Sequence, residues 1–334
     1  MTLVRIVKNW DWPDLLRQLP KDGSIWEGIQ FTLEPVDECD YLIVLNHPSE
    51  TFEIRCPRKH IWAIIQEPPY EFFRLLHKGN STYSRVYTPD TNLWGKRYIH
   101  SQPALPWHIN RDYDFLHHCD IPKKVRDLSW ITSNKDEFPG HRSRLRFLEK
   151  IQDNVEFDLY GRGFRYIKDK WDGLAPYRYS LAVENFSNSY YWSEKLADCF
   201  LAWTMPIYYG CTQISRYFPR ESMVCIDISD PQAIEKIKDT VASDRWYRNI
   251  DAIEHARKLV LDSYQLFPFV VREIKRYEEA CNYRQELSAE LITVSHQERP
   301  TALTMYERIG RLIADRALQR LKNLAARTAS RLRR

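Results

Sequence analysis

The feature that most constrains the fold of this 334-residue chain is a short apolar strand, which is followed directly by a polar turn and a helix. Residues 181–183 (Leu-Ala-Val) predict a buried strand, with Glu184 and Asn185 at its carboxyl end. The helix predicted after the turn carries Glu194 and Lys195 in its first turn. Free N–H groups and the helix dipole attract anions at such a position, and Glu194 suits sugar hydroxyls. We therefore predict an α/β fold with a nucleotide-sugar pocket, although an ordinary βα unit would share this pattern.

Strands and helices alternate along most of the chain, which predicts parallel sheets with a site at the strand ends. We divide the chain into a first domain (1–122), a second domain (125–265), a return helix that packs on the first domain (266–300) and a basic tail (302–334). The other strands expected are 41–45, 62–65, 85–87, 128–132, 155–160, 206–209 and 223–226. The helices expected are 71–77, 142–151, 231–241 and 251–261, with Pro139 and Gly140 in a loop.

The segment around Lys195 resembles the C-terminal signature of the family-10 glycosyltransferases, the α1,3/α1,4-fucosyltransferases. That signature is Glu-Asn-Ser, then Tyr-x-Thr-Glu-Lys, and later Pro-x-x-x-Gly. The matching residues have the same spacing here: Glu184, Asn185, Tyr191, Glu194, Lys195, Pro206 and Gly210. Ser193 replaces the Thr and keeps its hydroxyl, whereas Phe186 replaces the Ser and loses it. The resemblance covers residues 125–230 and thins upstream.

This resemblance implies a GT-B fold, in which two Rossmann-like domains face each other across a cleft. It also implies that Asn185 and Tyr191 line the phosphate and sugar part of a donor pocket and that Glu194 holds ribose hydroxyls. Glu184 belongs to the same donor-binding set. Lys195 would neutralise the charge of the departing nucleotide diphosphate.

The general base implied by the resemblance is Glu67. It follows an apolar strand in Trp62-x-x-x-x-Glu67-Pro68-Pro69, which resembles a Trp-x-x-x-x-Glu-Ser-Pro segment of the family. Pro68 stands where the family has Ser. A Glu before two prolines could also simply end the strand, because proline favours an extended residue before it.

A second diphosphate ligand is expected in the helix at 142–151. Arg144, in Arg-x-x-Phe with Phe147, resembles the family's phosphate-binding arginine, and Arg142 is the alternative half a helical turn away. A guanidinium suits bidentate phosphate contact. Gly161 and Gly163 either let the backbone approach the nucleotide or form a tight turn after a strand.

The seven cysteines are widely spaced and form no C-x-x-C pair, which favours reduced thiols in a cytosolic protein over zinc or a disulfide framework. No signal peptide or membrane span is evident, whereas eukaryotic members of the family are typically anchored in the Golgi by an N-terminal span. We therefore expect a bacterial-type cytoplasmic enzyme. Asp112-Tyr113-Asp114 fits an Asp-x-Asp metal motif, but it lies away from the donor motif and we interpret it as coincidence.

Charge is unevenly distributed along the chain. Residues 307–334 carry nine Lys or Arg against two acids, a net charge of +7, which leaves −3 for the remainder of a chain of net charge +4. An acidic body argues against general nucleic-acid binding. Residues 302–333 are predicted to form an amphipathic helix, since apolar residues recur every three to four positions. Such a helix would lie on an anionic membrane surface, at the inner face of the bacterial membrane, or would be solvated or packed on another subunit.

We expect an inverting glycosyltransferase that moves L-fucose from GDP-β-L-fucose to a hydroxyl of a glycan acceptor, with α1,3-fucosyltransferase-like chemistry. The alternatives are the same fold with another nucleotide sugar, or a non-catalytic protein that binds glycans or nucleotides. We expect the transfer reaction to require neither a metal site nor a cofactor. A divalent cation such as Mn²⁺ would at most stimulate it. The partners expected are GDP-fucose, a glycan acceptor and an anionic membrane surface, and no nucleic acid.

Overall fold

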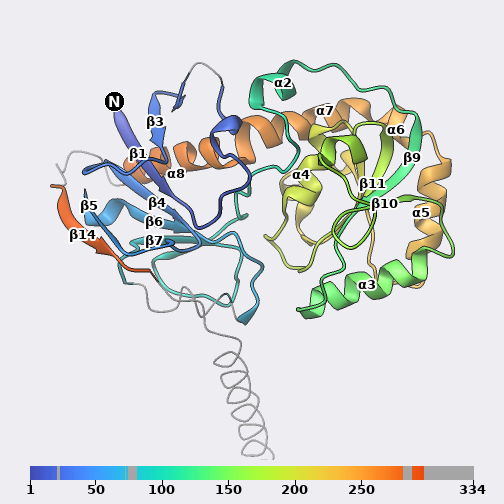
Figure 1. The fold of residues 1–334 in the computed structure, drawn as a ribbon, viewed down its shortest axis with the longest axis horizontal. Helices are drawn as coiled ribbons and strands as arrows, with labels where there is room; N and C mark the ends of the chain where they lie inside the picture. Colours follow the sequence, from blue (N-terminus) through green and yellow to red (C-terminus); the bar gives the residue numbers. More distant parts are fainter. Residues whose placement is uncertain (21–22, 72, 74–80, 281–287, 297–334) are drawn as a thin grey trace, which may run out of the picture.

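The protein has two α/β domains side by side, joined by a succession of helical segments at residues 250–280 that runs from the second domain back to the first (Figure 1). This computed structural model describes all residues except 21–22, 72, 74–80, 281–287 and 297–334. Most of the helix expected at 71–77, and the whole tail with its amphipathic helix, lie outside the described residues. Within the described part, no helix is both long enough and apolar enough to span a membrane.

The first domain is built on a seven-stranded sheet in the order β2-β3-β1-β4-β6-β7-β8. Its neighbouring strands are parallel except for β2 and β3, which are antiparallel. The strands are β1 (Thr2–Val7), β2 (Ile25–Trp26), β3 (Ile29–Thr32), β4 (Tyr41–Leu45), β6 (Ile61–Ile64), β7 (Arg85–Thr88) and β8 (Tyr98–His100). Because all five residues of β4 are buried, this strand forms the centre of the first core.

The second domain is built on an entirely parallel sheet in the order β10-β9-β11-β12-β13. The strands are β9 (Arg126–Ile131), β10 (Asp158–Tyr160), β11 (Tyr177–Val183), β12 (Met205–Tyr209) and β13 (Val224–Cys225). Its helices are α3 (Pro139–Ile151), α4 (Glu194–Leu201), α5 (Ala233–Ala242), α6 (Arg245–Arg248) and α7 (Ile250–Leu259). In both sheets the strand order reverses beside the first strand, between β1 and β4 and between β9 and β11. Ligands of open α/β sheets bind at such switch points.

The remaining elements tie the domains together. A π-helical turn (Val260–Tyr264) leads into α8 (Leu266–Ala280), whose Leu266 and Phe267 are fully buried in the core of the first domain. A further strand, β14 (Glu290–Val294), pairs antiparallel with β5 (Phe52–Cys56). The helix α2 (Tyr113–His118) lies between the two sheets in the sequence. Short 3-10 turns occur at Leu16–Gln18, Arg58–His60, Lys170–Gly173, Ile214–Arg216 and Arg220–Ser222.

The predicted architecture of two Rossmann-like domains is confirmed for the described residues, and several local predictions change. Pro139 and Gly140 open α3 instead of forming a loop, because proline fits the first turn of a helix, where its missing N–H is not needed. The segment 266–300 is not only a helix, since it contains β14. Asp112 caps α2 by accepting a hydrogen bond from the N–H of Phe115 at 2.8 Å, which gives the first Asp of the Asp-x-Asp sequence a structural role.

The segment between the domains is anchored by Lys124. Its Nζ donates to the carbonyl oxygens of Ala175 (2.8 Å) and Ala202 (2.9 Å) and to Oγ1 of Thr204 (3.2 Å). None of these partners carries a full negative charge. Burial therefore lowers the pKa of Lys124 to about 7, with only a small opposing effect from Cys199.

This environment predicts a pH dependence of stability. Between pH 7 and 10 the unfolded chain holds the Lys124 proton and the folded chain loses it, so the free energy of unfolding should rise with pH. The free energy of unfolding should rise by at most about 1.4 kcal/mol per pH unit from this one group. Urea unfolding at pH 7, 8 and 9 should show a smaller slope for Lys124→Met than for the wild type. Lys123→Met, at the exposed neighbouring position, is the control. Equal slopes for wild type and Lys124→Met would contradict the assignment.

Candidate functional site

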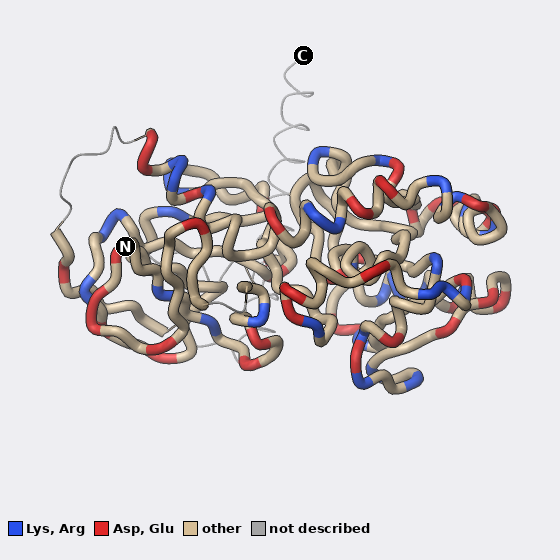
Figure 2. Tube along the Cα trace, turned by 90° about the horizontal axis from the view of Figure 1, so that it is seen from above, with Lys and Arg blue, Asp and Glu red and all other residues tan. Residues whose placement is uncertain are grey.

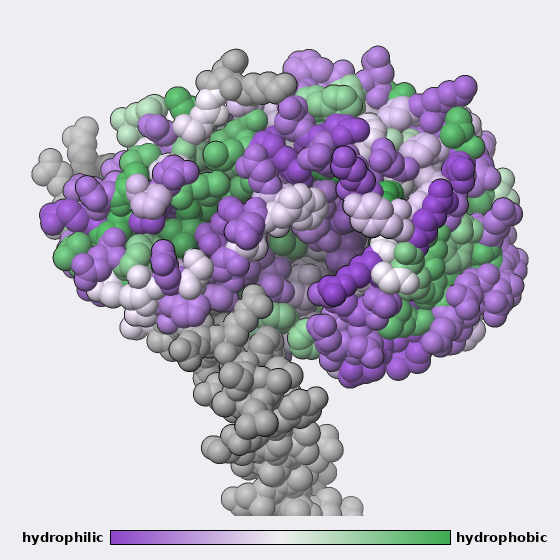
Figure 3. Space-filling model, in the orientation of Figure 1, coloured by the Kyte–Doolittle hydropathy of each residue, from purple (hydrophilic) through white to green (hydrophobic). Residues whose placement is uncertain are grey.

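A cavity of about 790 Å³ lies between the domains, at the carboxyl ends of strands from both sheets. Trp12 and Glu67 reach it from the loops after β1 and β6, and Thr132, Gly161 and Asn185 from the ends of β9, β10 and β11. In the space-filling view, hydrophilic residues border the hollow between the two halves (Figure 3). The cavity therefore occupies the switch point of the second sheet, where an α/β fold binds its ligand.

The described residues that line this cavity carry an excess of positive charge. Six are cationic and four are acidic, a net charge of +2. The cationic residues are Lys135, Arg144, Arg162, Lys168, Lys170 and Lys195, and the acidic ones are Glu67, Glu137, Asp169 and Glu194. Figure 2 shows both signs interspersed over the two domains. The excess is thus a property of the cavity, and it suits a ligand with about two negative charges.

A buried carboxylate, that of Glu184, organises the centre of the site. Glu184 is 1% exposed and does not line the cavity. Its Oε1 accepts hydrogen bonds from the backbone N–H of Ser193 (2.7 Å) and from Oγ of Ser193 (2.8 Å), and its Oε2 lies 3.3 Å from Nζ of Lys195. Glu184 therefore supports Ser193 and Lys195 from beneath the cavity, and its contact with a donor stays a prediction. The hydroxyl of Ser193 donates to this carboxylate. Serine and threonine both carry that hydroxyl, so the replacement of the family's threonine by serine keeps this hydrogen bond.

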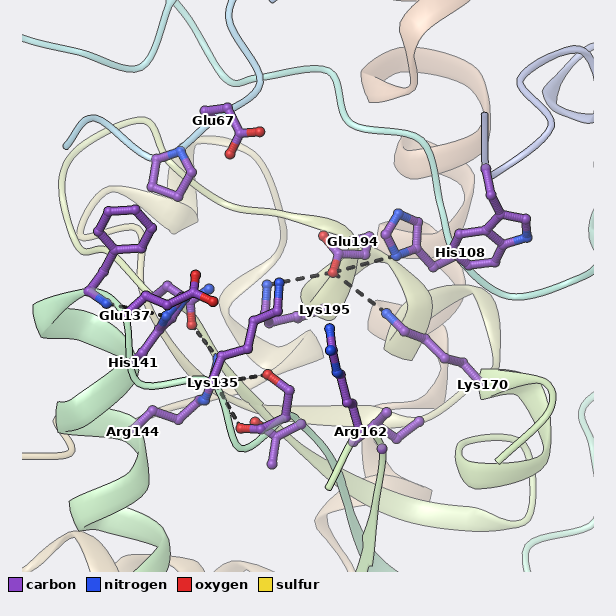
Figure 4. Close-up of a pocket in the computed structure, with 18 of the residues that line it drawn as sticks. Glu67, His108, Lys135, Glu137, His141, Arg144, Arg162, Lys170, Glu194 and Lys195 are labelled. Carbon is purple, nitrogen blue, oxygen red and sulfur yellow. Dashed lines mark hydrogen bonds and ion pairs between the residues drawn. The ribbon is translucent and has the colours of Figure 1, made fainter. Parts of the chain in front are cut away.

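Lys195 and Glu194 open α4 and point into the cavity (Figure 4). The Lys195 ammonium lies 3.5 Å from Oε1 of Glu194 and 3.0 Å from Oγ of Ser193. Burial lowers the pKa of Lys195, but the charges of Glu184 and Glu194 outweigh it and raise that pKa above its ordinary value. Burial raises the pKa of Glu194, yet Lys195 and Lys170 hold it well below its ordinary value. Both groups are therefore ionised at neutral pH.

Two residues without a motif complete the surroundings of Glu194. Nζ of Lys170 lies 3.6 Å from Glu194 and 3.0 Å from Oδ2 of the buried Asp198. Nδ1 of His108 lies 3.7 Å from Glu194. Burial lowers the pKa of His108 to about 3. The negative charge of Glu194 opposes this decrease, and the positive charges of Lys170 and Lys195 add to it. His108 is therefore neutral, and the lysines supply the charge that balances Glu194.

Arg144 is the arginine that α3 delivers to the cavity. It is 3% exposed, its Nη1 donates to Oδ1 of Asn185, and its Nη2 donates to the carbonyl oxygen of Ser133 at 2.9 Å. Arg142, the alternative, is exposed and does not line the cavity. Its Nη1 donates instead to the carbonyl oxygen of Asp136 at 2.8 Å, which stabilises the loop before α3.

The two glycines after β10 differ in their placement. Gly161 lines the cavity with φ +117°, and a Cβ there would lie 1.9 Å from the carbonyl oxygen of Thr132. Gly163, with φ +84°, packs against the side chain of Asn134 and does not line the cavity. Gly161 thus allows the ends of β9 and β10 to approach closely, and Gly163 forms the turn.

Residues of the first domain reach across the cleft to the second. The Tyr70 hydroxyl donates to the carbonyl oxygen of Asn185, and its ring stacks on Phe138 with centroids 4.8 Å apart. Glu67 lines the cavity near Tyr191, because its charge contributes to raising the pKa of that buried tyrosine, after burial itself. Phe186 packs edge-on against Tyr70, with centroids 5.3 Å apart. The phenylalanine that replaces the family's serine therefore belongs to an aromatic contact between the domains.

The structure brings together Glu67, Arg144, Asn185, Tyr191, Glu194, Lys195 and Gly161 around one cavity. Tyr70, His108 and Lys170 were missed by sequence reasoning, because each lies outside the recognised motifs. For Tyr70 the nearby Glu67-Pro68-Pro69 segment was a signal that this loop reaches the cleft. For Lys170 and His108 no pattern in the sequence pointed to the site.

Comparison with known proteins gives the family. Residues 121–248 match the family described as Glycosyltransferase family 10 (fucosyltransferase) C-term. These residues belong to glycosyltransferase family 10. The match contains β9 to β13 and the cavity residues that these strands and α3 and α4 contribute. The sequence-based identification of the family is therefore confirmed.

Among curated relatives, 4-galactosyl-N-acetylglucosaminide 3-alpha-L-fucosyltransferase 9 of Mus musculus is 26% identical over 135 residues, which are 38% of this chain and 37% of the relative. The human protein of that name gives the same figures. Alpha-(1,3)-fucosyltransferase 4 of Mus musculus is 24% identical over 233 residues, which are 64% of this chain and 51% of the relative. The chain thus matches little more than a third of the length of the first of these relatives.

A solved structure of an alpha1,3-fucosyltransferase with GDP is similar to this one, with 17% identity and a TM-score of 0.48. The similarity covers 86% of this chain and 91% of that one.

The central ion-pair network predicts a large effect of Glu184→Gln on stability. The amide keeps the shape but has one acceptor oxygen, so a donor of Ser193 or Lys195 is left unpaired, at a cost of about 1–3 kcal/mol in free energy of unfolding. Removing the facing cation as well, in Glu184→Gln with Lys195→Met, should recover part of that loss. Urea unfolding measures both. The control is Glu137→Gln, at an exposed residue of the same cavity. A Glu184→Gln protein as stable as wild type would refute the central role of this carboxylate.

Proposed function

We propose that this protein transfers L-fucose from GDP-β-L-fucose to a hydroxyl of a glycan acceptor with inversion at the anomeric carbon. The observation that carries the proposal is the convergence of Arg144, Lys195 and Glu194 in one basic cavity at the switch point of a family-10 domain. Two fixed cations suit a diphosphate, and an ionised carboxylate beside them suits ribose hydroxyls. The names of the curated relatives support fucose as the sugar.

The leaving group would be stabilised by Arg144 and Lys195. Arg144 is held by Asn185 and Ser133, and Lys195 by Ser193 and the two glutamates. Both cations are therefore in place before the ligand arrives, which is the condition for electrostatic stabilisation of a developing charge. These side chains would carry the role that a divalent cation has in other glycosyltransferases. We propose that no cofactor is required and that a cation such as Mn²⁺ acts at most as a stimulant.

The acceptor would be activated by Glu67 from the opposite domain. Its carboxylate would take the proton of the acceptor hydroxyl as that oxygen bonds to the anomeric carbon. The bond from that carbon to the diphosphate oxygen would break on the opposite face, and GDP would leave with the electron pair. In Figure 4, Glu67 lies well apart from Arg144, one of the two proposed diphosphate ligands, so we place base and diphosphate on different walls of the cavity. This separation agrees with an acceptor that enters from the first domain.

Another nucleotide sugar is the nearest alternative donor, and a binding protein without catalysis is the alternative of a different class. The donors can be distinguished by how much each nucleotide stabilises the protein against unfolding. An enzyme can be distinguished from a binding protein by measuring sugar transfer. The ionised pair of Glu194 and Lys195 favours an enzyme. A protein that only binds glycans does not need a cationic side chain that would bind a diphosphate.

A thermal-shift panel tests the donor. GDP should raise the unfolding midpoint more than UDP, CMP or ADP, with about 2.7 kcal/mol of stabilisation at one hundred times Kd. Arg144→Ala and Lys195→Ala should each lose most of that shift. Arg142→Ala is the matched control on the same helix and should keep it. Stabilisation by UDP-sugars and none by GDP would exclude the fucosyltransferase proposal.

Replacing the proposed base separates catalysis from binding. Glu67→Gln keeps the shape and removes the proton acceptor, so transfer to the acceptor should fall at least 100-fold, within the usual contribution of about 10²–10⁴ for a positioned base. The affinity for GDP should stay close to that of the wild type, since Glu67 belongs to the other domain. Initial rates and calorimetric titration measure the two quantities, with Glu137→Gln as control. Undiminished transfer would assign the base to another group.

We also propose that the protein is cytoplasmic and associates peripherally with an anionic membrane surface through residues 302–334. The support is the net charge of +7 in residues 307–334. Each Lys or Arg near such a surface contributes about 1 kcal/mol. Sedimentation with phosphatidylglycerol vesicles at low salt tests this, and protein that stays in solution would speak against it.

A further inference from the structure

A second cavity, of about 330 Å³, lies in the second domain and shares no lining residue with the cleft. It forms where β13, the edge strand of the sheet, meets α5, α6 and the turn that follows β12. Val224 of β13 and the neighbouring Ile214 and Met223 are buried and give it an apolar wall. Polar groups from separate segments are arranged around that wall.

Three cationic side chains converge on this cavity without an acidic one. Arg220 comes from a 3-10 turn, Lys236 from α5 and Arg245 from α6. None of the three side chains has an ion pair or hydrogen bond to another described residue. Two nearby acids are engaged elsewhere. Asp244 pairs with Arg248 at 2.7 Å, and Glu235 pairs with Lys238 at 3.6 Å.

One of the three cations, Arg245, also has a donor that lacks an acceptor within the described part of the chain. Nε of Arg245 is buried and has no hydrogen-bond partner among the described residues. Thr212 and Ser215 add two hydroxyl groups to the lining. The Cys225 thiol lies within the field of Lys236 and Arg245, since both charges oppose the rise that burial gives to its pKa.

We propose that this cavity binds a phosphate monoester or diphosphate group, separately from the cleft. Three unpaired cations and two hydroxyls match the oxygens of a phosphate, and guanidinium groups bind phosphate in bidentate fashion. The volume is less than half that of the cleft, which favours a small phosphorylated molecule or a phosphate headgroup over a whole nucleotide sugar. The proposal does not depend on the function assigned to the cleft.

The cavity is connected to the turn that precedes α4. Thr212, which lines it, donates its backbone N–H to the carbonyl oxygen of Asn188 at 2.8 Å. Oδ1 of Asn188 in turn accepts hydrogen bonds from the backbone N–H groups of Tyr190 and Tyr191. A ligand bound beside Thr212 would therefore contact a segment hydrogen-bonded to the wall of the cleft.

Cys225 provides a local readout, because it lines this cavity and not the cleft. Alkylation of Cys225 in the full chain by iodoacetamide, followed by peptide mass spectrometry, should slow in the presence of pyrophosphate. The expected factor is about tenfold at nine times Kd. The slowing should persist in Lys195→Met, whose cleft is impaired, and should disappear in the double variant Lys236→Gln with Arg245→Gln. The matched control, Lys238→Gln with Arg248→Gln, changes neighbouring exposed cations of the same two helices and should keep it.

Two further arms identify the source of the phosphate. Slowing by pyrophosphate but not by phosphatidylglycerol vesicles would indicate a soluble ligand, and slowing by those vesicles but not by phosphatidylcholine vesicles would indicate a headgroup. The proposal is overturned if neither probe slows alkylation in the wild type. It is equally overturned if the slowing is the same in the double variant Lys236→Gln with Arg245→Gln, or is lost in Lys195→Met.

Discussion

The buried carboxylate of Glu184 is the interaction on which the site depends. It directly follows β11 and receives donors from the N-cap and the first turn of α4, so a single side chain fixes how the strand and the helix meet. Burial raises its pKa, and the charge of Lys195 opposes that rise. A charge in such a place is tolerated because it is paired and hydrogen-bonded, and removing one partner leaves the other uncompensated. The geometry of the two ligand-facing residues, Glu194 and Lys195, follows from this pairing.

Much of the fold was predictable because local pattern and tertiary environment agree. The apolar run at 41–45 coincides with β4, which is buried on both faces as a central parallel strand should be. The first strand, β1, was missed. Its Arg5 interrupts the apolar run, and only the structure shows that it is 8% exposed and lies over the ring of Phe52. Cation–π contacts of this kind join distant segments and leave no periodic signal.

The candidate site was predictable where a compact motif carries it, and only there. The spacing from Asn185 to Lys195 placed those side chains correctly beside one cavity. The same motif could not distinguish Glu184 beneath the cavity from Glu194 inside it, because a residue's place in a motif does not say whether its side chain is buried or faces the cavity. Tyr70 enters from the first domain and His108 from the segment that joins the two sheets, so their contacts depend on how segments distant in the sequence pack. Arg144 and Arg142 likewise differ only in the direction each takes from α3.

The return of α8 has a consequence for how the chain is made. Leu266, Phe267 and Ile274 belong to the same core as Val4 and Ile6, although the whole second domain separates them in sequence. During synthesis the second domain has all its strands before those residues exist, whereas the first domain must wait for them to finish its core. The first domain thus begins earlier in the sequence but is completed after the second. Its core also needs contacts between residues far apart in the sequence, which gives it the higher entropic cost of loop closure. A fragment cut at residue 122 would therefore expose the apolar surface that α8 covers.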